Sequence, residues 1–258
     1  MWFFKKYRAL KIKKIVISQP DPQSEKSPYN ELAEKYGVQL DFRPFIHVEG
    51  VTSKEFRQQK INILDHSAVI FTSKTGIDHF FRLCEELRIT IPETMKYFCI
   101  TESIALYLQK YIVYRKRKVF YGNNTFKDLL DIILKHKDEK FLLPLSDPHK
   151  PEIPKALTKA KINYTKGIFY RTVSSDLSDL KPFPYDMIVF YSPNGIKSLF
   201  DNFPDFQQND IAIGAFGDTT AKAVKDAGLR LDCKAPTETF KSMTQALDHF
   251  LKEQSKKK

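Results

Sequence analysis

MIVFYSPNGIKSLF, residues 187–200, joins two structural signals in one short stretch. An apolar run ends at Phe190, a polar tetrad follows at 192–195, and a new apolar rhythm begins at Ile196. This order is typical of a strand that passes through a tight turn into a helix. The same order appears in AVIFTSKTGIDHFF, residues 68–81, which indicates that the turn is one copy of a repeat.

Further pairs of segments recur in the same order along the chain. They are KIVISQPDP (14–22) with KFLLPLSDP (140–148), QLDFRPF (39–45) with KGIFYRTV (166–173), MKYFCITESIALYL (95–108) with IAIGAFGDTTAKAV (211–224), and NNTFKDLLDIIL (123–134) with TETFKSMTQALDHF (237–250). Short apolar runs alternate with stretches of helical period throughout, which is the pattern of an α/β protein. The repeat therefore predicts two similar α/β lobes, each with a parallel sheet.

The net charge of +11 is concentrated at the ends of the chain. We expect a basic N-terminal tail at residues 1–11 and a basic C-terminal tail at 253–258, around a body that is nearly balanced in charge. One internal basic run, YRKRK at 114–118, is interpreted as a solvated face, with nucleic-acid binding as the alternative. We predict no nucleic-acid partner.

The sequence lacks the signals that are typical of membrane, secreted, disulfide-rich and metal-binding proteins. No apolar run approaches the roughly 18 residues of a membrane helix, and the first residues lack the apolar core of a signal peptide. Cys84, Cys99 and Cys233 are too few and too dispersed for a disulfide framework, and the histidines show no metal-ligand spacing. We therefore expect a cytoplasmic monomer without membrane contact, metal or cofactor.

The repeated turns indicate where a ligand would bind. Ligands of parallel α/β sheets bind beyond the carboxyl ends of the strands, where both turns are expected to lie. Helix N-termini at such an edge offer unpaired N–H groups and partial positive charge, which suit carboxylates or phosphates. Two lobes that face each other would form a cleft lined by these helix ends. The alternative is that the helix ends serve folding alone.

Several stretches of the second half resemble one enzyme family. SPNGI at 192–196, GDTTAKAVKDAGL at 217–229 and CKAPTETFKSMTQAL at 233–247 are similar to uroporphyrinogen-III synthases. FTSKTGI in the first half and the strand ending Tyr170-Arg171-Thr172-Val173 are similar too, and the likeness covers about residues 13–252. The resemblance implies two flavodoxin-like lobes joined by a two-stranded linker. Lobe one would be 12–43 plus 173–252, lobe two 44–172, with the crossings at Arg43-Pro44 and Arg171-Thr172.

The resemblance also implies a reaction. Members of the family close hydroxymethylbilane, a linear tetrapyrrole, to uroporphyrinogen III, with loss of water and inversion of the last pyrrole ring. The substrate carries several carboxylates, which a set of helix N-termini would suit. No cofactor is implied, and the partners would be the tetrapyrrole and an upstream deaminase that hands it over.

Tyr170 resembles the tyrosine that the family places near its cleft. A phenol is protonated at neutral pH and can donate a proton to the leaving hydroxyl. The alternative role is a structural hydrogen bond. For substrate binding, the resemblance and the repeated turns point to hydroxyl and backbone groups at helix starts, with N-capping alone as the alternative. These are Ser73, Lys74, Thr75, Gly76, Thr101, Ser103, Ser192, Pro193, Asn194, Gly195, Asp218, Thr219 and Thr220.

Three places depart from the family pattern. Gln19 stands where many relatives have an arginine, and Thr101 and Ile104 replace a glycine and a threonine beside the extra charge of Glu102. In LSDPHK, residues 145–150, a glycine and an arginine are missing, although Lys150 offers a charge. Two hypotheses remain: a divergent but active synthase, or a catalytically impaired homologue that binds a tetrapyrrole or another polyanion as a regulatory protein.

Overall fold

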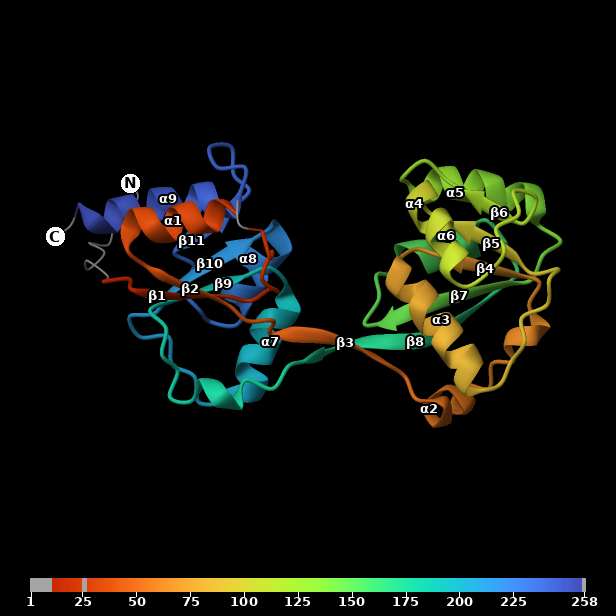
Figure 1. Ribbon diagram of the computed structural model, residues 1–258, viewed down its shortest axis with the longest axis horizontal. Coiled ribbons are helices and arrows are strands. Elements are labelled where there is room, and N and C mark those ends of the chain that lie inside the picture. Colours follow the sequence, from red (N-terminus) through yellow and green to blue (C-terminus); the bar gives the residue numbers. More distant parts are fainter. Residues whose placement is uncertain (1–10, 25–26, 257–258) are drawn as a thin grey trace. The chain divides into compact units, whose positions relative to one another are not determined.

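The computed structural model describes residues 11–24 and 27–256, which form two compact units (Figure 1). Unit 1 runs to His47 and resumes at Val173, and unit 2 is Val48–Thr172. Strands β3 (Ile46–Gly50) and β8 (Tyr164–Ser174) carry the chain across the two boundaries and are neighbours in one sheet. The predicted α/β fold with two parallel-sheet lobes is confirmed. The expected N-terminal tail lies, apart from Lys11, outside the described residues.

Unit 1 contains a five-stranded sheet in the order β11-β10-β9-β1-β2. Its strands are β1 (Lys14–Ile17), β2 (Gln39–Phe42), β9 (Met187–Phe190), β10 (Ala212–Phe216) and β11 (Cys233–Ala235). All of their pairings are parallel, and the order is that of flavodoxin. Because helices cover both faces of such a sheet, its central strands are continuous apolar runs.

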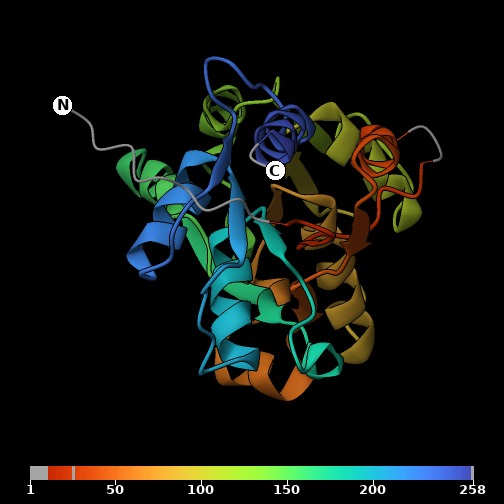
Figure 2. The ribbon, with the colours of Figure 1, turned by 90° about the vertical axis from the view of Figure 1, so that its left-hand side faces the viewer.

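Helices cover both faces of this sheet. Helices α1 (Pro28–Tyr36) and α9 (Met243–Ser255) lie side by side on one face, as Figures 1 and 2 show, where Ile15 and Ile17 pack against them. On the other face Val16 packs with α7 (Pro193–Asn202) and α8 (Asp218–Asp226), and a short 3-10 turn, η4, is Ser178–Leu180. Helix α9 continues to Ser255 because Leu251 and Gln254 are buried, so the segment assigned to a C-terminal tail begins within a helix.

Unit 2 contains a six-stranded sheet in the order β3-β8-β7-β4-β5-β6. Its remaining strands are β4 (Ala68–Phe71), β5 (Lys96–Cys99), β6 (Val119–Tyr121) and β7 (Phe141–Asp147). Helices α2 (Ser53–Gln58), α3 (Lys74–Glu86) and α4 (Glu102–Tyr107) cover one face, and α5 (Phe126–Ile133) and α6 (Glu152–Lys159) the other. Short 3-10 turns are η1 (Ile63–Asp65), η2 (Leu108–Lys110) and η3 (Leu134–His136).

The duplication predicted from the sequence is confirmed by the strand order. Strands β2-β1-β9-β10-β11 of unit 1 correspond in turn to β8-β7-β4-β5-β6 of unit 2. One detail of the match was wrong. Thr125 caps α5 directly, whereas Thr239 precedes α9, which starts after Ser242. Helix α9 starts after Ser242 because this residue forms a reciprocal capping box with Gln245.

Candidate functional site

Both repeated turns lie at the carboxyl edge of their own sheet. Strand β4 leads into α3, whose N-cap is Ser73, and strand β9 leads into α7, whose N-cap is Ser192. The Ser73 hydroxyl accepts a hydrogen bond from the Gly76 N–H at 2.9 Å, and Ser192 accepts one from the Gly195 N–H at 3.3 Å. Both serines therefore do cap their helices, and each cap leaves the other N–H groups of that first turn to be satisfied elsewhere.

Tyr170 lies against the start of α3 in unit 2. Its hydroxyl is 3.2 Å from the Ser73 hydroxyl, although the two residues are 97 apart in the chain. The register of β7 and β8 shifts between Leu145 and Ser146, so Tyr170 pairs with Ser146 at the strand end. Such irregularities commonly re-aim a side chain beside a functional site. The structure thus brings together two of the predicted site residues, Tyr170 and Ser73.

Gly76 and His79 complete the surroundings of Tyr170. A Cβ atom at Gly76 would lie 4.0 Å from the Tyr170 ring and 3.3 Å from the Ser73 hydroxyl, so the glycine leaves room for both. The His79 imidazole stacks on the Tyr170 ring, with centroids 5.2 Å apart and an interplanar angle of 16°. The sequence analysis missed His79. Its spacing of three residues from Gly76 on a predicted helix was the available signal.

The environment of His79 keeps its imidazole neutral. Burial lowers the pKa of His79, and the Arg82 charge lowers it further, while Asp78 acts in the opposite sense. The Arg82 Nε–H donates a hydrogen bond to His79 Nδ1 at 3.3 Å, which leaves the ring proton on Nε2. A neutral imidazole therefore lies beside the phenol of Tyr170.

Lys74 and Thr75 are the other two predicted residues of the 73–76 turn. Lys74 is exposed, and its ammonium lies 5.3 Å from the centroid of the Tyr107 ring, a cation–π contact. Thr75 is partly exposed at the first turn of α3. The charge of Lys74 is thus held on the surface near the end of α4.

A polar hollow of about 650 Å³ lies at the carboxyl ends of β5 and β6. The Thr101 hydroxyl accepts a hydrogen bond from the Ile104 N–H at 3.3 Å and is 3.1 Å from the Ser103 hydroxyl. Glu102 and Asp128 also line the hollow, and Glu102 accepts a hydrogen bond from the Tyr121 hydroxyl at 3.0 Å. Two carboxylates in one hollow oppose the binding of a third, so this part of unit 2 disfavours an anion.

Helix α8 of unit 1 begins differently from the other site helices. Its N-cap is Gly217, with φ of 88°, and within the described residues no side chain makes the capping hydrogen bond. Asp218 is exposed and pairs with Lys234 at 2.6 Å, and the lysine lowers the pKa of that carboxyl. Thr219 is exposed, whereas Thr220 is only 1% exposed, so it offers a ligand its backbone rather than its side chain.

Pro193 and Asn194 occupy the first turn of α7, beside an aromatic cluster of unit 1. Pro193 is at the first position of the helix, where the N–H that it lacks is not needed. Just before the turn, the Tyr191 hydroxyl hydrogen-bonds the hydroxyl of Tyr29, and burial raises the pKa of both phenols. Tyr191 also stacks on Phe216 at 5.4 Å. This cluster, which the sequence analysis missed, makes the edge beside α7 apolar.

Two arginines, Arg171 inside β8 and Arg43 directly after β2, form ion pairs within their own units. Arg171 pairs with Glu55 at 2.8 Å in unit 2, and Arg43 pairs with Asp179 at 2.7 Å in unit 1. Lys150 is exposed and Gln19 is partly exposed. Because both ion pairs are partly exposed, an anion at these edges would share each arginine with its carboxylate partner.

Residues suited to metal or redox chemistry are dispersed. In the described part of the chain, no three His, Cys, Asp or Glu side chains gather where they could hold a metal ion. Cys84, Cys99 and Cys233 are free thiols, and burial raises the pKa of each to about 12. Among the same described residues, no helix combines the length and apolar character needed to cross a membrane.

Comparison with known proteins decides the family. A sequence profile described as uroporphyrinogen-III synthase HemD matches residues 27–245. The chain belongs to the uroporphyrinogen-III synthase HemD family. The site of unit 2 around Tyr170 and that of unit 1 around α7 and α8 both fall inside the part of the chain that matches this family.

Two solved structures share the fold of this uroporphyrinogen-III synthase family member. The uroporphyrinogen-III synthetase from Helicobacter pylori is 16% identical, with a TM-score of 0.56, and the match covers 94% of this chain and 100% of that one. A mutant uroporphyrinogen III synthase from Thermus thermophilus is 17% identical, with a TM-score of 0.50 over 95% of this chain and 100% of that one. At such identities the likeness shows the fold alone. A search among curated proteins finds no match.

Proposed function

We propose that this protein is a uroporphyrinogen-III synthase, which closes hydroxymethylbilane to uroporphyrinogen III with inversion of the last pyrrole ring. The observation that carries the proposal is the Tyr170 phenol, held at the carboxyl edge of unit 2 beside the N-terminus of α3, in a chain of this family. The substrate is a linear tetrapyrrole rich in carboxylates, supplied by an upstream deaminase. The chemistry proposed below needs proton transfer and anion binding but no cofactor.

Tyr170 is the proton donor in this proposal. The bond between the terminal carbon and its hydroxyl oxygen breaks as that oxygen takes a proton from the phenol, and water leaves. The azafulvene cation that remains is attacked by the substituted α-carbon of the last pyrrole, which gives a spiro intermediate. The bond from that carbon to its original methylene then breaks, and the second azafulvene cation formed in this way is attacked by the free α-carbon of the same, now inverted, ring. The proton lost from that carbon as the ring regains aromaticity restores the phenol. The hydrogen bond to Ser73 and the stacked His79 ring hold Tyr170 in one orientation.

Substrate carboxylates are bound in this proposal by helix N-termini, which supply N–H donors and partial positive charge. Unit 1 contributes the first turn of α8 behind Gly217 and that of α7 behind Ser192. The open first turn of α8 is the better of the two, because the cap of α7 already takes one of its N–H groups. Asp218 does not oppose this, since Lys234 neutralises it.

The deciding experiment is an isomer assay. Purified protein is mixed with freshly prepared hydroxymethylbilane, and the uroporphyrinogen isomers are separated after oxidation. We expect type III product well above the type I product that forms spontaneously. The matched control is Tyr170→Phe, which keeps the ring and its stacking on His79. Only type I product from the wild-type protein would reject the proposed activity.

A second candidate function is binding without turnover, and the acidic hollow of unit 2 favours it. Glu102 and Asp128 stand at an edge where an anion-binding enzyme would be expected to carry neutral or basic groups. In this case hydroxymethylbilane or its cyclised product raises the melting temperature of the protein while the isomer ratio stays at the spontaneous value. Glu102→Gln is then expected to tighten binding a few-fold, because a repulsive charge at the surface is worth about 1 kcal/mol or less.

A further inference from the structure

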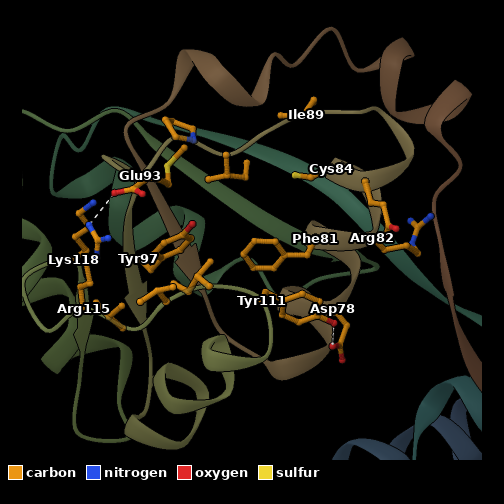
Figure 3. A pocket seen from close by; sticks show the side chains of 17 residues that line it. Asp78, Phe81, Arg82, Cys84, Ile89, Glu93, Tyr97, Tyr111, Arg115 and Lys118 are labelled. Atoms are coloured by element: carbon orange, nitrogen blue, oxygen red, sulfur yellow. Dashed lines mark hydrogen bonds and ion pairs between the residues drawn. The ribbon is translucent and has the colours of Figure 1, made fainter.

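A second cavity, of about 550 Å³, lies in unit 2 at the amino ends of β5 and β6 (Figure 3). Met95 and Lys118, which line it, directly precede these strands, whereas Tyr170 lies in β8 opposite Ser146, near the carboxyl end of β7. The second half of α3 and the loops at 87–95 and 111–118 form the rest of its wall. None of the predicted site residues is among those that line it. The cavity is therefore separate from the carboxyl-edge site of the proposed function.

The body of the cavity is apolar and largely aromatic. Phe81 from α3 stacks on Tyr111, with centroids 4.5 Å apart and an interplanar angle of 5°, and Tyr97 from β5 lies 6.5 Å from Phe81. Ile89 and Cys84 add to the wall, as Figure 3 shows. Concave aromatic walls of this kind suit a flat, conjugated ligand, and the volume lies in the usual range for small-molecule sites.

At one end of the cavity the charged groups are already satisfied. Asp78 accepts hydrogen bonds from the hydroxyls of Tyr107 and Tyr111 and from the ammonium of Lys110. Arg82 donates to the Val51 carbonyl at 2.7 Å and pairs with Glu86. A ligand gains little at this end, because each of these groups would have to give up an existing partner.

The other end of the cavity carries the ammonium group of Lys118. Figure 3 shows Glu93, Arg115 and Lys118 grouped there, and Arg115 pairs with Glu93 at 2.9 Å. Lys118 is partly buried and makes no ion pair within the described residues. Glu85 is likewise unpaired there, but it is exposed and hydrated. A partly buried ammonium beside an apolar wall favours an anionic group on the ligand.

We propose that this cavity binds a planar aromatic carboxylate, with its rings against the walls that Phe81 and Tyr97 line and its carboxylate on Lys118. Arg115 provides a second positive charge, because its exposed pairing with Glu93 is weak and can be shared. The proposal also accounts for the basic run at 114–118, two of whose members line the cavity. It is independent of the tetrapyrrole reaction, since it uses other residues at the opposite edge of the sheet.

The test uses 2-naphthoate as the probe and 2-acetylnaphthalene as its neutral analogue of similar shape. Binding to the full-length wild-type protein is followed by probe fluorescence and by mapping amide chemical shifts. We expect saturable binding of 2-naphthoate, shifts confined to residues 78–97 and 108–119, and clearly weaker binding of the neutral analogue. The Lys118→Gln variant should bind 2-naphthoate about tenfold more weakly, the effect of losing one charge-assisted hydrogen bond.

Lys116→Gln is the matched control, because it removes the same charge from the same run at an exposed residue that does not line the cavity. It should leave the affinity unchanged. The proposal is overturned if 2-naphthoate fails to bind, if the neutral analogue binds equally well, if the shifts map elsewhere, or if both lysine variants weaken binding alike. The comparison of the two probes on wild-type protein decides the matter even if a variant folds poorly. None of these readouts depends on synthase activity.

Discussion

Units 1 and 2 share one framework and differ at its carboxyl edge. Five strands in matching order, with helices on both faces, recur in each unit. In unit 2, β8 brings Tyr170 to the start of α3, whereas β2 of unit 1 ends in Phe42 followed by Arg43. The shared parts are buried and apolar, and the parts that differ are the few residues after each strand. Similar cores thus carry different chemistry at their edges.

Helices α8 and α4, which follow the corresponding strands β10 and β5, give a second contrast between the two units. Helix α8 of unit 1 begins at Gly217 with an open first turn, whereas α4 of unit 2 begins at Thr101, whose hydroxyl caps it, beside the carboxylate of Glu102. An anion is favoured at the first and opposed at the second. Unit 1 is therefore suited to holding carboxylates and unit 2 to proton transfer, which is the division that the predictions below test.

The largest effect is expected for Tyr170→Phe. Loss of the phenolic proton should lower the rate of type III formation about a hundredfold or more, the usual contribution of a general acid. Tyr164→Phe is the matched control, since its hydroxyl also lies on β8 but contacts Pro154 and Thr158 on α6. Isomer assays on both variants measure the effect. Near-normal turnover of Tyr170→Phe would remove the proton donor from unit 2 and leave the family assignment intact.

Gly217→Ala should break the anion site of unit 1. With φ of 88° and ψ of 151°, Gly217 has a conformation that essentially only glycine adopts, so we expect a loss of about 1–3 kcal/mol in the free energy of unfolding and a displaced first turn in α8. Gly37→Ala, at φ of 60° and ψ of 39° with open space around it, should cost about 1 kcal/mol. Chemical denaturation and KM measurements separate the two: only Gly217→Ala should raise KM. Equal KM values would refute the role of α8.

Ser73→Ala and Ser192→Ala compare the two repeated turns directly. Each change removes an N-cap and should lower the free energy of unfolding by about 1 kcal/mol. Only Ser73 also touches Tyr170, so a double-mutant cycle with Tyr170→Phe should show coupling for Ser73 and additivity for Ser192. Urea denaturation of the single and double variants gives both quantities. Coupling of equal size at both serines would contradict the contrast between the units.

The smallest effect concerns the pH dependence of unit 2. Hydrogen bonds from Thr52, and then the Arg171 charge, lower the pKa of Glu55 from 4.5 to about 2. The ionised carboxylate therefore stabilises the fold fully above pH 4.5, and this contribution is lost as the pH falls toward 2. Glu55→Gln should thus be less stable than wild type at neutral pH, and the gap should narrow on acidification. Denaturation midpoints between neutral pH and about pH 2 measure it; a gap that stays constant through this range would be inconsistent with the pairing.

Much of the framework was predictable from the sequence because its signals are local. Apolar runs such as 187–190 and 68–71 identify buried strands, and Ser27-Pro28 marks the start of α1 before any contact is known. Local signals also compete within the paired segments. Thr125 of NNTFKDLLDIIL caps α5, whereas Thr239 of TETFKSMTQALDHF precedes α9, because the capping box of Ser242 and Gln245 sets the start of that helix.

The site was less predictable, because contacts between distant residues make it. Tyr170 and the serine turns were identified, but the stacking of His79, the burial of Thr220 and the pairing of Arg171 with Glu55 were not. Each depends on the direction in which a side chain points within a packed element. A periodic sequence pattern predicts that direction only to within a residue or so. The register shift before Tyr170 is of the same kind.

The sequence by itself determined the order and type of the elements and the duplication, because hydrophobic periodicity and capping act over a few residues. Only the tertiary structure decided that Tyr170 meets Ser73, that Lys118 lines a cavity together with Phe81 and Tyr97, and that two carboxylates share the hollow of unit 2. Parallel sheets bring residues far apart in the chain to one edge. Which groups meet there depends on register and packing, and a linear pattern does not contain either.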